Sequence, residues 1–204
     1  MAHYAIKEIF RTLQGEGGQA GTPMVFVRFA GCNLWSGREE DRAEARCDFC
    51  DTDFVGGEHL EIGQILARIE ALSGPRWICF TGGEPALQLD RALVEAVRAR
   101  GYRAAIETNG TVALDEIRPF IDWVCMSPKT ADLKVSSGDE LKLIYRGQSS
   151  EAILAYEKLD FDHFFLQPEA GARYDALLAG ALAFLQNQSR WRLSLQMHKL
   201  IGLP

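Results

Sequence analysis

The sequence predicts an α/β fold in which parallel strands form an incomplete (β/α) barrel of about six strands. Short strand-like runs alternate with helix-like runs along the chain, a pattern typical of βα units and a parallel sheet. Most predicted strands are followed at once by polar or glycine-rich clusters, as in folds whose active site lies at the carboxyl ends of strands. The chain has 204 residues, whereas a complete eight-stranded barrel typically needs about 250.

Hydrophobic periodicity places the individual elements. The apolar run MVFVRFAG over residues 24–31 predicts the first barrel strand. Apolar residues at positions 62, 65, 66, 69 and 72 share one helical face, so residues 61–72 predict a helix. Two further helices are predicted over 87–101 and 175–186. The remaining predicted strands cover residues 76–80, 103–107, 121–127, 140–145, 163–167 and 191–197, and residues 4–10 predict an additional edge strand.

Bulk composition limits the classes of function. Hydrophobic residues make up 47% and charged residues 25%, which predicts one globular domain over residues 1–204. A net charge of −6 argues against a main task of gripping phosphate backbones, so we expect no direct nucleic-acid partner. No apolar run approaches the ~20 residues of a membrane span, and the first residues lack a signal-peptide layout. We therefore expect a cytoplasmic protein without membrane contact.

Three of the five cysteines, Cys32, Cys47 and Cys50, lie in one segment with C-x14-C-x2-C spacing. A reducing compartment disfavours a disulfide framework, and the charged residues between the cysteines disfavour plain core thiols. Two metal-binding interpretations remain open. Structural zinc needs a fourth ligand, such as His59, whereas an iron–sulfur cluster on three thiolates leaves one iron open to bind a ligand. The other two cysteines lie in apolar runs and are expected to be core thiols.

Further motifs accompany the cysteines and cover the chain nearly end to end. They are EIFRTLQGEG (8–17), FVRFAGCNLW (26–35), CDFCDTDF (47–54), TGGEP (81–85), IETNG (106–110), SPK (127–129) and the terminal LSLQMHK…P. Together they resemble the 7-carboxy-7-deazaguanine synthase family of the radical S-adenosylmethionine (SAM) superfamily. The superfamily spacing is C-x3-C-x2-C, from which this chain departs by its insertion, and this family tolerates such an insertion. The CDFC half is kept, with Phe49 in the aromatic position.

This resemblance implies a radical SAM enzyme with a truncated barrel that forms homodimers. The reaction is the conversion of 6-carboxy-5,6,7,8-tetrahydropterin to 7-carboxy-7-deazaguanine by radical ring contraction with loss of ammonia, which makes the enzyme a carbon–nitrogen lyase. The product feeds queuosine-type tRNA modification. No side chain is expected to be catalytic itself, since SAM carries the radical.

The resemblance also implies a [4Fe–4S] cluster, SAM and Mg²⁺ as cofactors. Cys32, Cys47 and Cys50 would ligate the cluster, whose open iron would chelate the amino and carboxylate groups of SAM. Thr52 would bind Mg²⁺ through its hydroxyl group. On chemistry alone Asp51 or Asp53 would be the better Mg²⁺ ligand, and a share in binding stays open for both. A flavodoxin- or ferredoxin-type protein would donate the electron.

The polar clusters after the strands supply the expected SAM contacts. Gly83 lets a ligand lie against the main chain, and Glu84 offers an acceptor for the amino group of SAM. The expected SAM-binding residues are Phe49, Gly83, Glu84, Ser127, Pro128, Lys129 and Gln167.

A second group of residues is expected to bind the pterin. Arg28 lies in an apolar strand, so its charge must be paired or face a ligand, and a guanidinium group suits a carboxylate. Gln14 and Glu16 offer groups complementary to a pterin edge. The expected substrate-binding residues are Leu13, Gln14, Gly15, Glu16, Arg28, Thr81, Glu107, His198 and, through the chain-end carboxylate, Pro204.

Two other functions compete with this one. A glycyl-radical-enzyme activating protein would share the radical chemistry, but such proteins lack the combination of LQGEG with HK…P. A zinc-stabilised binding module would contain zinc without iron and sulfide. The insertion over residues 36–46 is either a support for the cluster or a docking surface for the electron donor.

Overall fold

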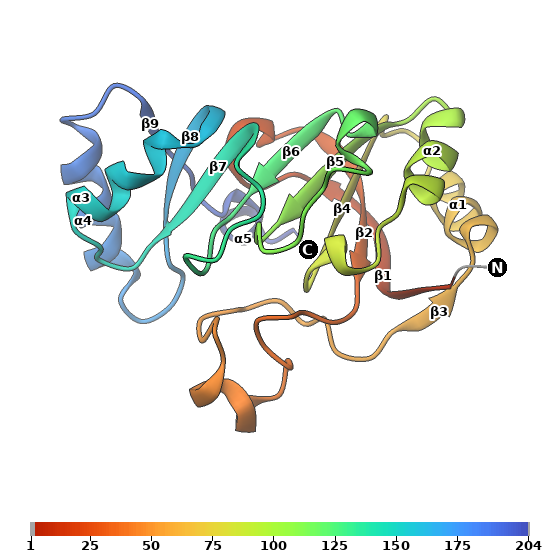
Figure 1. Cartoon of the computed structure of the whole chain (residues 1–204), viewed down its shortest axis with the longest axis horizontal. Coiled ribbons are helices and arrows are strands. Elements are labelled where there is room, and N and C mark those ends of the chain that lie inside the picture. The colour runs from red at the N-terminus through yellow and green to blue at the C-terminus, as the bar shows by residue number, and fades with distance from the viewer. Residues whose placement is uncertain (1–2, 204) are drawn as a thin grey trace.

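The computed structural model describes residues 3–203, and in that range the strands form one mixed sheet of nine strands (Figure 1). The strands are β1 (Tyr4–Leu13), β2 (Pro23–Phe29), β3 (Glu58–Leu60), β4 (Trp77–Gly82), β5 (Arg103–Thr108), β6 (Trp123–Met126), β7 (Ser137–Tyr145), β8 (Asp160–Pro168) and β9 (Trp191–Leu193). Their order is β3-β1-β2-β4-β5-β6-β7-β8-β9, parallel from β2 to β9. The sheet has two edges and does not close, which confirms the predicted open barrel with one parallel strand more.

Most of the helices connect strands and lie toward the two ends of the sheet (Figure 1). The helices are α1 (Ile62–Ala71), α2 (Arg91–Ala99), α3 (Ser150–Leu154), α4 (Tyr174–Leu185) and α5 (Met197–Ile201). The first two lie beside the N-terminal strands, and α3 and α4 lie beside β8 (Figure 1). The predicted helices over 61–72 and 175–186 are confirmed. The predicted helix over 87–101 begins later, because Asp90 caps α2 by accepting a hydrogen bond of 3.0 Å from the Leu93 N–H.

Among residues 3–203, no helix is long and apolar enough to cross a membrane.

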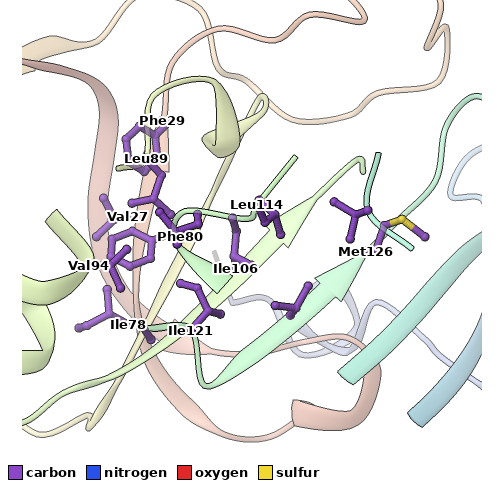
Figure 2. Packing of buried hydrophobic residues seen from close by; sticks show 14 of the residues in the cluster. Val27, Phe29, Ile78, Phe80, Leu89, Val94, Ile106, Leu114, Ile121 and Met126 are labelled. Carbon is purple, nitrogen blue, oxygen red and sulfur yellow. The ribbon is translucent and has the colours of Figure 1, made fainter. Parts of the chain in front are cut away.

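Alternation along the strands separates an apolar outer face from a polar inner one. On β2, Val27 and Phe29 belong to the core between sheet and helices, whereas Arg28 lines a cavity on the inner face. Figure 2 shows Phe80 of β4 and Val94 of α2 in the same core. Because the apolar residues of α1, α2, α3 and α4 pack in the core on the outer face, polar side chains can gather on the inner face.

Two further thiols stay away from the cysteine segment. Cys79 and Cys125 are buried in β4 and β6, as expected of core thiols. Burial raises the pKa of both well above the usual range of a thiol.

Two strand predictions need correction. Residues 4–10 do not form an edge strand, because β3 pairs with β1 and makes it an internal, antiparallel strand. The predicted strand over 191–197 is shorter, because the chain leaves the sheet after β9. The backbone N–H of Met197 donates to the Gly15 carbonyl at 2.9 Å, and α5 starts at this point. His198 therefore lies on a helix, not at a strand end.

Candidate active site

A cavity of about 380 Å³ opens at the carboxyl ends of the parallel strands. The polar clusters that follow β4, β5, β6 and β8 converge on it, as the sequence predicted. Loops after β1 and β2 and the C-terminal helix α5 complete its wall. The predicted site residues that line the cavity are Leu13, Gln14, Gly15, Glu16, Arg28, Cys47, Phe49, Cys50, Thr52, Thr81, Gly83, Glu107, Ser127, Lys129, Gln167 and His198.

The other predicted site residues lie elsewhere. Cys32 is half-buried in the same loop system as Cys47 and Cys50. Pro128 is buried between Ser127 and Lys129, so only its neighbours face the cavity. Pro204 lies outside the described residues.

The Glu84 carboxylate accepts hydrogen bonds from inside the protein. This side chain is fully buried and does not line the cavity. Its carboxylate accepts hydrogen bonds from the Ala86 N–H at 3.0 Å, the Thr108 hydroxyl at 2.8 Å and the Asn109 N–H at 2.7 Å. Burial raises the pKa of Glu84. Glu84 therefore supports the loops after β4 and β5, and its contact with SAM stays a prediction.

Gly83 is required by a close approach of two loops. The Gly83 N–H donates to the Phe29 carbonyl at 3.2 Å, and the Glu84 N–H donates to the Gly31 carbonyl at 2.9 Å. A Cβ atom at Gly83 would lie 2.0 Å from the Gly31 carbonyl oxygen. A glycine here thus lets the loop after β4 pack directly on the loop that carries Cys32.

Hydrogen bonds join the two ends of the segment between Cys32 and Cys47. The Leu34 carbonyl accepts hydrogen bonds from the Arg46 N–H at 2.9 Å and from the Cys47 N–H at 3.3 Å. The residues between these points leave and re-enter the fold at almost the same place, as the loop below the sheet in Figure 1 shows. The insertion therefore keeps Cys32 and Cys47 close together in space despite fourteen intervening residues.

The thiols lie next to cationic side chains. Burial raises the pKa of Cys47, and the nearby Lys129 ammonium group partly offsets this effect. Lys129 donates to the Ser127 hydroxyl at 2.7 Å and lies 5.4 Å from the centre of the Phe49 ring. Arg146 covers the same ring at 4.4 Å. The positive charge of these two side chains favours the thiolate form of the cysteines on this loop.

The three thiols do not form a ready single-ion site. Within residues 3–203, no group of three or more His, Cys, Asp or Glu side chains is placed to hold one metal ion. Zinc needs its ligands to converge at about 2.3 Å from one point, whereas a cluster takes each thiolate on a different iron. His59, the fourth zinc ligand considered above, is exposed on β3 and is not among the residues that line the cavity.

Lys142 is the main site residue that sequence analysis missed. Its side chain is 4% exposed, and its ammonium group lies 2.6 Å from Glu16 Oε2 and 2.9 Å from Glu107 Oε2. Gln14 donates to the other oxygen of Glu107 at 2.8 Å. A charge between apolar neighbours in LKLIY is the same signal that identified Arg28, so the pattern could have revealed it.

The cluster of charges around Lys142 sets the ionisation of Glu16. Burial opposes ionisation of this carboxyl group, but the charge and hydrogen bond of Lys142, with a hydrogen bond from Gln196, lower its pKa to about 2. Burial also opposes the charge on Lys142, and the surrounding anionic groups raise its pKa well above the usual range. Glu16 thus faces the cavity as a carboxylate.

Arg28 fulfils both expectations at once. Its Nε donates to Glu8 Oε1 at 2.7 Å, and its guanidinium group lies 5.4 Å from the centre of the Phe10 ring. It also lines the cavity, and its side chain is 19% exposed. One edge of the guanidinium group is therefore held by Glu8 while the group faces the space in which a ligand would lie.

Three residues that could bind Mg²⁺ line the cavity side by side, but two are engaged. Asp51 pairs with Lys199, and Asp53 pairs with Lys7 at 2.7 Å. Thr52 lies between them. Each aspartate thus already holds a lysine, and Mg²⁺ binding by Thr52, Asp51 or Asp53 stays a prediction.

The chain is similar in sequence to known radical SAM proteins. The sequence profile of the radical SAM superfamily matches residues 42–159. The chain is 50% identical to a 7-carboxy-7-deazaguanine synthase from Bordetella pertussis and 49% identical to one from Caulobacter vibrioides, in each case over 98% of this chain and 99% of the relative. The chain belongs to the 7-carboxy-7-deazaguanine synthase family. Membership of the radical SAM superfamily implies a [4Fe–4S] cluster and SAM.

Other members of the family are more distant, yet they match over similar lengths. A 7-carboxy-7-deazaguanine synthase from Bacteroides thetaiotaomicron is 41% identical over 97% of both chains. The crystal structure of QueE from Escherichia coli superposes with a TM-score of 0.72 at 25% identity, over 96% of this chain and 95% of that one. The fold described above is thus the fold of the family.

Proposed function

We propose that this protein is a 7-carboxy-7-deazaguanine synthase, which converts 6-carboxy-5,6,7,8-tetrahydropterin to 7-carboxy-7-deazaguanine with loss of ammonia. One observation supports this proposal above the others: the thiol loop and the Glu16–Lys142–Glu107 cluster face the same cavity. The thiols suit a radical-generating cluster, and the carboxylates suit a heterocycle rich in N–H donors.

Cys32, Cys47 and Cys50 would hold the [4Fe–4S] cluster. Bound together, the cluster and SAM supply the radical that removes a hydrogen atom from the substrate. Of the predicted SAM contacts, Phe49, Gly83, Ser127, Lys129 and Gln167 remain in the proposal because they line the cavity. Pro128 contributes by fixing the turn between its two neighbours.

Polar groups of the cavity would orient the pterin. Glu16 and Glu107, held by Lys142, would accept hydrogen bonds from the amino and ring N–H groups of the pyrimidinone edge. Arg28 would bind the substrate carboxylate, with Glu8 fixing its orientation. Leu13, Gln14, Gly15, Thr81 and His198 complete the wall around the ring.

The proposal includes further components that family membership suggests. Thr52 would bind Mg²⁺ together with water and substrate oxygens. The chain would act as a single-domain homodimer in the cytoplasm, and a flavodoxin- or ferredoxin-type protein would reduce the cluster. Pro204 would also contact the substrate.

The direct test is a reaction under anaerobic conditions. Protein reconstituted with iron and sulfide is incubated with SAM, a reductant, Mg²⁺ and the carboxy-tetrahydropterin. Formation of 7-carboxy-7-deazaguanine and ammonia is the expected result. A cluster-loaded, reduced protein that consumes SAM without forming the deazaguanine would refute the proposal.

A further inference from the structure

The insertion between Cys32 and Cys47 reaches back to the cysteine loop through a single side chain. This side chain is Arg42, in the short 3-10 helix η2 (Glu39–Glu44). Its Nη1 atom donates to the Asp48 carbonyl at 2.9 Å and to the Cys50 carbonyl at 3.1 Å. These two carbonyl groups lie on either side of Phe49, so one guanidinium group spans the C-x2-C turn.

Arg42 is itself held in place from two directions. Glu39 accepts from its Nε at 2.7 Å and from its Nη2 at 2.5 Å, a two-point pairing that fixes the plane of the guanidinium group. The ring of Trp35 stacks against it at 4.0 Å. The Arg42 side chain is 28% exposed despite the many charges around it.

The stacking partner is anchored in the fold. Trp35 is 7% exposed, its ring N–H donates to the Arg38 carbonyl at 3.0 Å, and its ring meets the edge of Phe54 at 5.6 Å. Phe54 is 1% exposed, and its carbonyl accepts from the Gly31 N–H at 3.1 Å. A continuous set of contacts thus leads from the first barrel strand to Arg42 and from Arg42 to the backbone of Cys50.

We infer that Arg42 is a positioning residue for the iron–sulfur cluster and that the insertion serves to present it. By bonding the Asp48 and Cys50 carbonyl groups, Arg42 fixes the backbone from which the second and third thiols project. Groups that orient metal ligands from outside affect metal retention strongly, typically 10- to 100-fold. This inference rests on the proposed function only in assigning a cluster to these thiols.

The experiment measures cluster retention, not turnover. Wild-type protein, Arg42→Met, Arg42→Lys and the control Arg38→Met are reconstituted anaerobically, and iron and sulfide per chain are determined. The rate of iron loss to a chelator is then followed by the decay of the visible absorption. Arg38 is a suitable control because it lies in the same insertion and its side chain is 70% exposed, with only a 3.8 Å contact to Glu40.

Arg42→Met is expected to lose iron roughly tenfold faster than wild type, while Arg38→Met loses it at the wild-type rate. Arg42→Lys keeps the charge but lacks the fork that reaches both carbonyls and Glu39, so an intermediate rate is expected. Circular dichroism checks that the variants fold. If Arg42→Met does not fold, the rate of iron loss from Arg42→Lys tests the inference instead.

Two results would overturn the inference. One is wild-type retention in both Arg42 variants, which would leave the insertion with another role such as donor docking. The other is equal loss in Arg38→Met, which would make the effect one of net charge. A wild-type protein that takes up no cluster would instead refute the proposed function, so the two failures are distinguishable.

Discussion

Lys142 on β7 and Glu16 in the loop after β1 form an ion pair inside the cavity, with 2.6 Å between Nζ and Oε2. The two residues are far apart in the sequence, yet the pair joins the N-terminal extension of the sheet to the middle of the barrel. Glu107 and Gln196 bind the same pair from two further elements.

Replacing Lys142 should lower the stability of the folded protein. Lys142→Met leaves Glu16 and Glu107 as half-buried carboxylates without their cation, so the free energy of unfolding should fall by ~3 kcal/mol. Denaturant unfolding of the protein measures this. The control Lys134→Met removes a lysine that is 57% exposed and should change stability by less than about 0.5 kcal/mol. Equal stability of Lys142→Met and wild type would refute the role of the pair.

The pH dependence of stability follows from Glu16. Its pKa falls on folding from the ordinary 4.5 to about 2, so the unfolded chain binds the proton more tightly than the folded protein. The stabilisation is fully present above pH 4.5 and is lost as the pH falls toward 2. It amounts to something on the order of 3 kcal/mol.

The variant Glu16→Gln isolates this contribution. Because other carboxyl groups also titrate in acid, the informative quantity is the difference in unfolding free energy between wild type and Glu16→Gln. This difference should shrink as the pH is lowered from 5 to 2. A difference that stays constant across this interval would show that Glu16 keeps an ordinary pKa in the folded protein.

Gly15 controls the position of His198. A Cβ atom at Gly15 would lie 2.1 Å from His198 Nδ1 and 2.9 Å from its Cβ, so rotation of the imidazole ring alone cannot relieve the clash. Gly15→Ala should displace α5 from the cavity and lower kcat/KM by roughly 10- to 100-fold. Gly63→Ala is the matched control, since a Cβ atom there meets open space. Unchanged kinetics in Gly15→Ala would contradict this packing.

Mg²⁺ dependence tests the assignment of Thr52. Omitting Mg²⁺ should slow product formation while the visible spectrum of the cluster stays unchanged. Thr52→Ala should raise the Mg²⁺ concentration needed for half-maximal activity roughly tenfold, whereas Thr22→Ala, in the turn before β2, should not. If turnover proves indifferent to chelation of Mg²⁺, the assignment fails.

The sequence predicted the barrel and most of the cavity because both depend on local patterns. Strand ends followed by polar clusters fix which residues meet, and sixteen of the predicted site residues line the cavity. The hydrogen bonds of Glu84 could not be predicted in this way. Whether a carboxylate faces a ligand or accepts three internal hydrogen bonds depends on loops from other strands, as Thr108 and Asn109 show for Glu84.

The end of the last strand could not be predicted from local sequence either. WRLSLQM reads as a strand by composition, but the Gly15 carbonyl captures the Met197 N–H and the chain turns into α5. Similarly, the effect of the cysteine insertion depends on the Leu34 carbonyl, which closes the loop by bonds that no spacing rule reveals.

In the proposed function, three thiolates hold a four-iron cluster and leave one iron for SAM. Mössbauer spectroscopy of protein reconstituted with ⁵⁷Fe, with and without SAM, tests it most directly. SAM is expected to change the signal of one iron site in four, and Cys32→Ala, Cys47→Ala and Cys50→Ala are each expected to abolish this change. A spectrum that SAM leaves unaltered, or a cluster that persists after loss of any of these thiols, would contradict it.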